Sequence, residues 1–202
     1  MAPTAADYAW FDERFPDLAE AYCFTLVRGL TPAQVLARLG ARTGGPQVKG
    51  VEALSRLSYD TYPERAGNEL VVGVTPVGGW ALAVEPNGYI GVSEEAAVPL
   101  SAGSRLVSHS TNVNAVGNFF WVEDGDVRLT FEPLFPSSRW GGTPDALLGE
   151  MREAGFDLQD GDDANLDCGA AAFALAERLT GVRITPEILT DSTFLCGLAP
   201  VP

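Results

Sequence analysis

One passage of the sequence gathers side chains that could carry out chemistry. It is Ser108-His109-Ser110-Thr111, followed by Asn112 and Asn114, and it contains the only histidine of the chain. A histidine beside a hydroxyl group can act as a general base for a nucleophile. No Gly-x-Ser-x-Gly turn is present to expose such a serine. Two interpretations stay open: a polar catalytic pocket around His109, or a histidine at a strand end with Asn112 and Asn114 capping a turn.

The three cysteines give no sign of a metal or redox site. Cys23, Cys168 and Cys196 are widely spaced and form no Cys-x-x-Cys pair. With a single histidine, a zinc site is not expected. Any of the three thiols could pair with His109 only if the fold brought them together, and buried structural thiols are the more common outcome. Cys196, near the end of the sequence, is the one that we expect at the surface.

An acidic stretch from Asp157 to Asp163, with Asp167 beyond it, raises the question of calcium binding. A register that starts at Asp160 puts Ala164 and Asn165 where an EF-hand loop needs an oxygen ligand and a glycine. Aspartates before a helix are also stabilised by the helix dipole. The glycine pairs match neither the dinucleotide nor the phosphate-binding loop. We therefore predict no metal, no cofactor and no assigned catalytic residue.

The loop from Pro133 to Gly142 is a second candidate binding surface. It carries Phe135, Arg139 and Trp140, and aromatic and arginine side chains are the commonest anchors of protein interfaces. In the alternative interpretation, Phe135 and Trp140 fold back to cover the sheet edge or the core. The candidate binding surface thus comprises His109, Asn112, Asn114, Phe135, Arg139 and Trp140.

These residues must be positioned by a sheet with helices around it. Alternation of apolar and polar side chains predicts strands, with a strong hairpin turn at Pro86-Asn87-Gly88. The predicted strands are 22–28, 70–75, 80–85, 89–92, 104–109, 118–123 and 127–132. Strands with one face buried and one wet favour antiparallel pairing.

The predicted helices flank this block of strands. Thr31, Pro32 and Gln34 form a strong helix start, and Gly40 can end that helix. The other predicted helices are 8–15, 51–58, one capped by Thr143 over 144–154, 166–180 and a short one that starts at Thr185-Pro186. We predict one domain over residues 1–202. Its fold class is α+β, with a mostly antiparallel central sheet of about six strands, helices at the N-terminus and a helical C-terminal third packed on the sheet.

The charge balance restricts the partners. The 202 residues include 13 Lys and Arg against 27 Asp and Glu, a net charge of −14. Nucleic acids and anionic membranes repel such a protein, whereas a basic protein is attracted. The alternative interpretation is that the acidity serves solubility alone, as in many bacterial proteins. The first residues show no signal peptide, and no apolar run approaches the length of a membrane span, so we expect a cytoplasmic protein with reduced thiols.

Five segments together resemble an uncharacterised actinobacterial protein family that is catalogued as a domain of unknown function. They lie at 22–32, 79–88, 112–116, 131–136 and 151–156, so the resemblance spans nearly the whole chain. It implies one bacterial cytosolic domain and supplies no activity and no catalytic residue. Our leading hypothesis is a non-enzymatic binding or regulatory module for a protein partner, for example an immunity-like protein that binds a basic protein. The alternative is an enzyme of unrecognised type that uses a polar pocket around His109.

Overall fold

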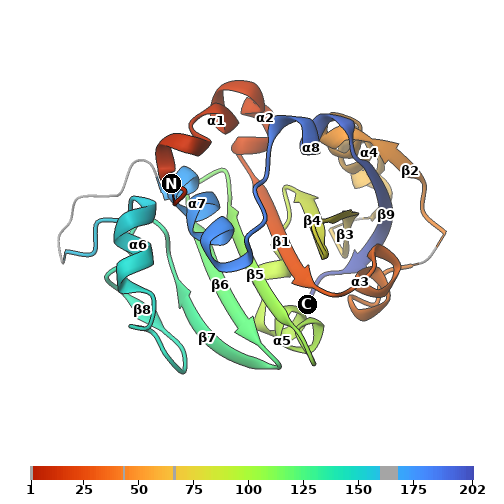
Figure 1. Cartoon of the computed structure of the whole chain (residues 1–202). Helices are drawn as coiled ribbons and strands as arrows, with labels where there is room; N and C mark the ends of the chain where they lie inside the picture. Colours follow the sequence, from red (N-terminus) through yellow and green to blue (C-terminus); the bar gives the residue numbers. More distant parts are fainter. Residues whose placement is uncertain (1, 43, 66, 160–167) are drawn as a thin grey trace.

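The structure, a computed structural model, describes residues 2–42, 44–65, 67–159 and 168–202. Within them the chain forms one nine-stranded sheet in the order β2-β9-β3-β4-β1-β5-β6-β7-β8, and the neighbours pair antiparallel (Figure 1). The strands are β1 (Tyr22–Arg28), β2 (Gln47–Lys49), β3 (Glu69–Val77), β4 (Trp80–Pro86), β5 (Arg105–Thr111), β6 (Gly117–Glu123), β7 (Asp126–Phe131), β8 (Arg139–Trp140) and β9 (Thr193–Pro200).

Helices cover both faces of the sheet. The α-helices are α1 (Trp10–Arg14), α2 (Pro16–Ala19), α3 (Pro32–Arg38), α4 (Gly50–Arg65), α5 (Glu94–Leu100), α6 (Leu148–Ala154), α7 (Cys168–Thr180) and α8 (Pro186–Asp191), and the 3-10 helices are η1 (Ala5–Tyr8) and η2 (Ile90–Val92). One apolar cluster joins strand residues such as Phe24 to α1, α4, α6 and α7. We call this side of the sheet the α7 face. The other cluster joins residues such as Val27 to α3, η2 and α5, and we call that side the α5 face.

Local sequence signals explain several of these elements. The predicted start of α3 is confirmed, because Thr31 N donates to Gln34 Oε1 at 2.9 Å and Gln34 N donates to Thr31 Oγ1 at 3.3 Å. Gly40 follows α3 with a positive φ of 66°, as a residue after a helix end often does. The predicted alternation in β1 is also confirmed, since Phe24 and Leu26 share the α7 face while Cys23 and Val27 share the α5 face.

Two parts of the predicted fold class are wrong. The sheet has nine strands and not about six, because β2 and β8 are too short to show a period and β9 was not recognised. The C-terminal third is not simply helical, since β9 inserts between β2 and β3. Gly197 suits that position, because a Cβ there would lie 3.1 Å from Leu36 and Ala41. The predicted helix 166–180 is described from Cys168 onward, and most of the acidic stretch, 160–167, lies outside the described residues.

The predicted return strand at 89–92 is a third error, and it has a local cause. The chain forms the 3-10 helix η2 there and does not join the sheet. The backbone N–H groups of Ile90 and Gly91 donate to the two carboxylate oxygens of Glu85, at 2.8 and 2.9 Å. A strand would need these N–H groups for its ladder. Because the Glu85 side chain accepts both of these hydrogen bonds, residues 90–92 form a 3-10 helix and not a strand.

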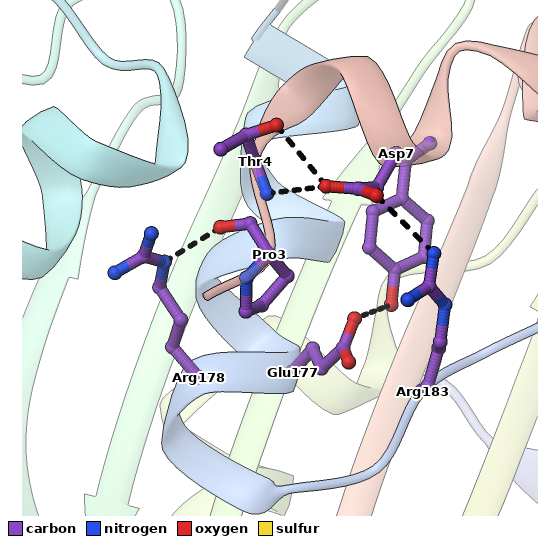
Figure 2. Close-up of polar contacts among 7 residues, drawn as sticks. Pro3, Thr4, Asp7, Glu177, Arg178 and Arg183 are labelled. Carbon is purple, nitrogen blue, oxygen red and sulfur yellow. Dashed lines mark hydrogen bonds and ion pairs between the residues drawn. The ribbon is translucent and has the colours of Figure 1, made fainter. Parts of the chain in front are cut away.

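A polar network fixes the N-terminal segment to α7 (Figure 2). The Tyr8 hydroxyl donates to Glu177 Oε2 at 2.7 Å, and Arg178 Nε donates to the Pro3 carbonyl at 2.7 Å. The Tyr8 ring also stacks on Phe173, with 5.3 Å between the ring centroids. Arg183 reaches Asp7 at 3.3 Å on the surface. These contacts hold α1 over the α7 face, where its aromatic residues close the core.

Candidate functional site

His109 lies in the core and not in a surface pocket. Its side chain points to the α7 face of β5, it is 3% exposed, and its ring centroid is 4.4 Å from that of Phe173. The rings of Tyr22 and Phe24 complete the enclosure at 5.6 and 5.8 Å. Burial lowers the pKa of His109 to about 3, so the ring is neutral at physiological pH. Within the described parts of the chain, its Nδ1 atom has no hydrogen-bond partner.

The opposite face of the same strands carries a row of polar side chains. Cys23 on β1 pairs with Glu85 on β4 and with Ser110 on β5, and Ser110 pairs with Asn118 on β6. Directly paired residues point to the same face of a sheet, so these four side chains are neighbours across four strands. Exposure rises along the row, from the buried Glu85 and Cys23 to the exposed Asn118. We call this set the polar row.

Two buried hydroxyl groups, those of Thr25 and Ser108, lie beside the buried end of the polar row. Thr25 Oγ1 and Ser108 Oγ are 2.8 Å apart, and Ser108 Oγ donates to the Phe24 carbonyl at 3.0 Å. Because a serine has one hydroxyl proton, Thr25 must be the donor to Ser108. The Cys23 sulfur lies 3.5 Å from Ser108 Oγ. Both buried hydroxyl groups thus have an acceptor for their proton.

Glu85 is the charged member of the polar row, and it is 1% exposed. Burial raises its pKa to about 7, while its bonds from the Ile90 and Gly91 N–H groups act in the opposite direction. We call Glu85 with these two N–H groups the Glu85 clasp. Gly91 is required here, because a Cβ at that position would overlap Thr25 Oγ1. The clasp therefore fixes η2 against the sheet through hydrogen bonds from its backbone N–H groups to the Glu85 carboxylate.

A surface pocket of about 270 Å³ lies at the exposed end of the polar row. It is lined by residues of the turn and 3-10 helix after β4, by the end of β5, and by the β5–β6 hairpin and the start of β6. Tyr89 and Val116 line it and are 50% and 46% exposed, and Val113 at the hairpin tip is 71% exposed. We call this cavity the hairpin pocket. It combines apolar rim residues with hydroxyl and amide groups from Ser110 and Asn118.

Asn112 builds the rim of the hairpin pocket. Its Oδ1 atom accepts hydrogen bonds from the backbone N–H groups of Asn114 and Val116, at 2.9 and 3.2 Å. Its own N–H donates to the Val116 carbonyl at 3.0 Å. The predicted capping of a turn by Asn112 is confirmed, whereas Asn114 is an exposed residue within that turn. The hairpin tip is therefore held in one shape by an asparagine side chain.

None of the described residues that line the hairpin pocket is basic or acidic, and two acidic residues follow its lining in the chain. Segments 87–96 and 108–118 contain Glu94 and Glu95 and neither lysine nor arginine. Both glutamates are exposed in the first turn of α5. They follow directly on Ser93, which lines the pocket. A cation that approaches this region meets an attractive potential.

The other predicted surface residues lie away from the hairpin pocket. Arg139 and Trp140 form the edge strand β8, which β6 and β7 separate from β5. Arg139 Nε donates to Asp145 at 2.8 Å, and its Nη1 donates to the Pro136 and Ser137 carbonyls, so Arg139 organises its own loop. Trp140 is 62% exposed and Phe135 is also exposed. The structure therefore divides the six predicted residues among the core, the hairpin pocket and the β8 edge.

The surroundings of the three cysteines are those of unreactive structural thiols. Cys23 and Cys196 are buried, so the expectation that Cys196 lies at the surface is wrong. Cys196 is enclosed because β9 is an inner strand of the sheet. Burial raises the pKa of Cys23, of Cys168 and of Cys196, the last to about 11, so none is a ready thiolate. In the described ranges, no three acidic, histidine or cysteine side chains group as a metal site would require.

Sequence reasoning missed Glu85, Tyr89 and Val116, although a signal for Glu85 was present. Trp80 to Val84 is wholly apolar, and Glu85 continues the alternation on the side of Ala81 and Ala83. That position predicts a buried carboxylate directly before a glycine turn. Tyr89 carried no such signal, because its exposure depends on the 3-10 helix that the Glu85 clasp creates.

Comparison with known proteins gives a family and no function. The whole chain, residues 1–202, matches a family model described as a family of unknown function (DUF6461). This agrees with the resemblance seen in the sequence. No curated protein and no solved structure matches the chain. Of the helices that the structure describes, none combines the length and the apolar character needed to cross a membrane.

Proposed function

The chain belongs to the DUF6461 family of unknown function, and we propose that it is a cytoplasmic protein-binding module that contacts a basic protein through the hairpin pocket. The observation that carries the proposal is the exposure of Tyr89 and Val116 at a pocket that no basic residue of the described chain lines, with Glu94 and Glu95 exposed directly after Ser93 of its lining. Free cysteines fit a reducing compartment.

The side chains at the pocket are suited to protein contact. Tyrosine is among the residues most often found as interface anchors, since it offers a large rigid area and a polar tip. Tyr89 projects half-exposed from the rim, with Val116 beside the same cavity. Exposed apolar side chains that cluster around a polar cavity are typical of interaction sites.

The rigid base of the pocket supports the same interpretation. The Glu85 clasp holds one wall, and the Asn112 hydrogen bonds hold the other. A surface that is ordered before contact loses less conformational entropy on binding. The network therefore favours recognition of a partner without a large rearrangement.

Charge gives the partner its class. The net charge of −14 attracts basic proteins over a distance, and Glu94 and Glu95 lie in the turn of α5 that follows Ser93 of the pocket lining. Such complementarity raises association rates and selects against acidic partners. A basic toxin that this protein neutralises would be one partner of this class.

The catalytic alternative has less support. An active site needs a cavity where a base meets a second reactive group. The His109 ring is packed among Tyr22, Phe24 and Phe173 on the α7 face, while the hairpin pocket lies on the α5 face of the same strand. We therefore assign no catalytic role to His109.

The proposal is tested by quantitative affinity capture from a lysate of the native host. The wild-type protein, the double variant Tyr89→Ser/Val116→Ser and the control Trp140→Ser are immobilised at equal density. Bound proteins are identified and quantified by mass spectrometry. We expect a basic protein at near-stoichiometric yield on the wild type and on Trp140→Ser, and at least tenfold less on the double variant. The purified partner should then bind the wild type in solution with the same dependence.

Three results would overturn the proposal. One is capture of no protein in stoichiometric amount, and the second is undiminished capture on the double variant Tyr89→Ser/Val116→Ser. The third is loss of capture on Trp140→Ser alone, which would move the contact to β8. Thermal unfolding of each variant checks that the substituted proteins are folded before capture.

A further inference from the structure

The hairpin pocket offers few places for an anion. The backbone N–H groups around it are used within the protein, and each of the following has an acceptor: Asn87, Gly88, Val92, Ser93, Asn112 and Val116. Anion sites in proteins are usually built from free backbone N–H groups or basic side chains. Segments 87–96 and 108–118 hold neither lysine nor arginine. The lining that the structure describes therefore offers neutral hydroxyl and amide groups and one aromatic ring, and no fixed positive charge.

A buried carboxylate lies directly behind the pocket wall. Gly88 lines the pocket, and a Cβ on Gly88 would lie 2.7 Å from Glu85 Oε2. The wall at this point is thus a glycine backbone with the Glu85 carboxylate against its inner side. Charges act more strongly through the low dielectric of the protein interior than through water. Above its pKa of about 7, the ionised Glu85 therefore adds to the negative potential inside the pocket without being exposed.

The rim and the lining supply the other parts of a cation site. Tyr89 presents a half-exposed ring, and the face of such a ring attracts a guanidinium or ammonium group. Ser110, Thr111 and Asn118 contribute side chains with oxygen acceptors. The volume of about 270 Å³ is near the lower end of ligand pockets, which hold roughly 300–1,000 Å³. This size suits one long side chain better than a complete small molecule.

We infer that the hairpin pocket seats a cationic side chain of the partner protein, with its alkyl stem against Val116 and its charged end between the Tyr89 ring and the wall formed by Gly88. The inference rests on the proposed function and names the chemical group that the site recognises. Arginine and lysine share this chemistry, and the experiment separates them.

The test uses the full chain and small probes, so that it does not depend on the identity of the partner. The isotope-labelled protein is titrated at pH 8 with N-acetyl-arginine amide, N-acetyl-lysine amide and N-acetyl-citrulline amide, and backbone amide resonances are followed by NMR. Citrulline matches arginine in shape and lacks its charge. We expect saturable shifts at Tyr89, Ser110 and Asn118 with arginine, and an affinity at least tenfold weaker with citrulline. A response to lysine equal to that of arginine assigns charge as the recognised property, and a response to arginine alone assigns the guanidinium.

Variants locate the site. Tyr89→Leu keeps an apolar rim and removes the ring, so the arginine affinity should fall severalfold, while Trp140→Ser should leave it unchanged. Equal shifts with citrulline and arginine, no saturable shift, or shifts outside the pocket would each overturn the inference. If that happens while capture of the partner still depends on Tyr89 and Val116, the proposed function stands and only the cation site is wrong.

Discussion

The Glu85 carboxylate accepts a hydrogen bond from the Gly91 backbone N–H at 2.9 Å, and this bond ties the end of β4 to the 3-10 helix beside the hairpin pocket. Gly91 lies six positions after Glu85 in the chain, and the intervening turn supplies Asn87, Gly88 and Tyr89 to the pocket lining. The stability of this turn and the shape of the pocket therefore depend on one buried acid.

Glu85→Gln should change how stability depends on pH. Burial raises the pKa of Glu85 from 4.5 to about 7, so between these values the folded chain binds a proton that the unfolded chain has lost. Its contribution is therefore complete below pH 4.5 and is lost as the pH rises to about 7. The size of this loss is about 3 kcal/mol. Urea unfolding from pH 4.5 to 8 should show a smaller fall in stability for the variant than for the wild type, and identical slopes would contradict the assignment.

His109→Phe should leave the protein as stable at pH 7, or more stable by up to about 1 kcal/mol, because it removes a buried polar atom without a partner. Burial lowers the pKa of His109 to about 3, so between pH 6.5 and about 3 this side chain is protonated in the unfolded chain and neutral in the folded chain. Wild-type stability is thus lost as the pH falls from 6.5 toward 3, with a sign opposite to that of Glu85. The variant should lack this part of the acid sensitivity.

His109→Gln is the matched control for the phenylalanine substitution. Glutamine keeps a polar group in the aromatic enclosure of Phe24 and Phe173, and it should be the less stable of the two variants. Higher stability of the glutamine protein in chemical denaturation would indicate an unrecognised polar contact at this position.

Gly91→Ala should destabilise the fold by about 3 kcal/mol or more, since its Cβ would overlap Thr25 Oγ1 and force the hydroxyl pair apart. Gly149→Ala is the control, because that helical glycine has open space around its Cβ position and alanine favours a helix. Thermal and urea unfolding measure both. In a double-mutant cycle, Thr25→Ala should recover part of the loss at Gly91 by removing the overlapping atom.

Tyr8→Phe should lower the free energy of unfolding by about 1–2 kcal/mol, because the Glu177 carboxylate loses the donor that it meets at 2.7 Å (Figure 2). Arg183→Ala, which removes the surface contact with Asp7, should have a smaller effect. Denaturant titration at pH 7 compares the two. An equal or larger loss for Arg183→Ala would mean that the N-terminal segment is held from the surface and not through Tyr8.

The parts of the fold that were predicted from sequence are those with local causes. Thr31 and Gln34 fix the start of α3 within one turn, and strand alternation places Phe24 and Val27 on opposite faces. The strand β9 has no comparable signal, because its place depends on β2 and β3, which are more than a hundred residues earlier in the chain. Long-range pairing is decided by packing and not by periodicity.

The candidate site was predicted in part for the same reason. Asn112 was correctly identified as a turn former, since its hydrogen bonds reach only four residues along the chain. His109 sits one position from Ser108 and Ser110, and only the pairing of β5 with β1 decides that the histidine faces the aromatic core while the serines face the other side. The exposed position of Tyr89 could not be predicted, because it depends on the turn that Glu85 stabilises.

The inner position of β9 also has a consequence for synthesis at the ribosome. Translation proceeds from the N-terminus, so β1, β3, β4, β5, β6 and β7 can pair while the rest of the chain is still being made. β2 cannot, because its neighbour in the sheet, β9, is about 145 residues later. Until that strand emerges, the edge of β3 that β9 later covers has no partner strand and is open to pairing with other nascent chains.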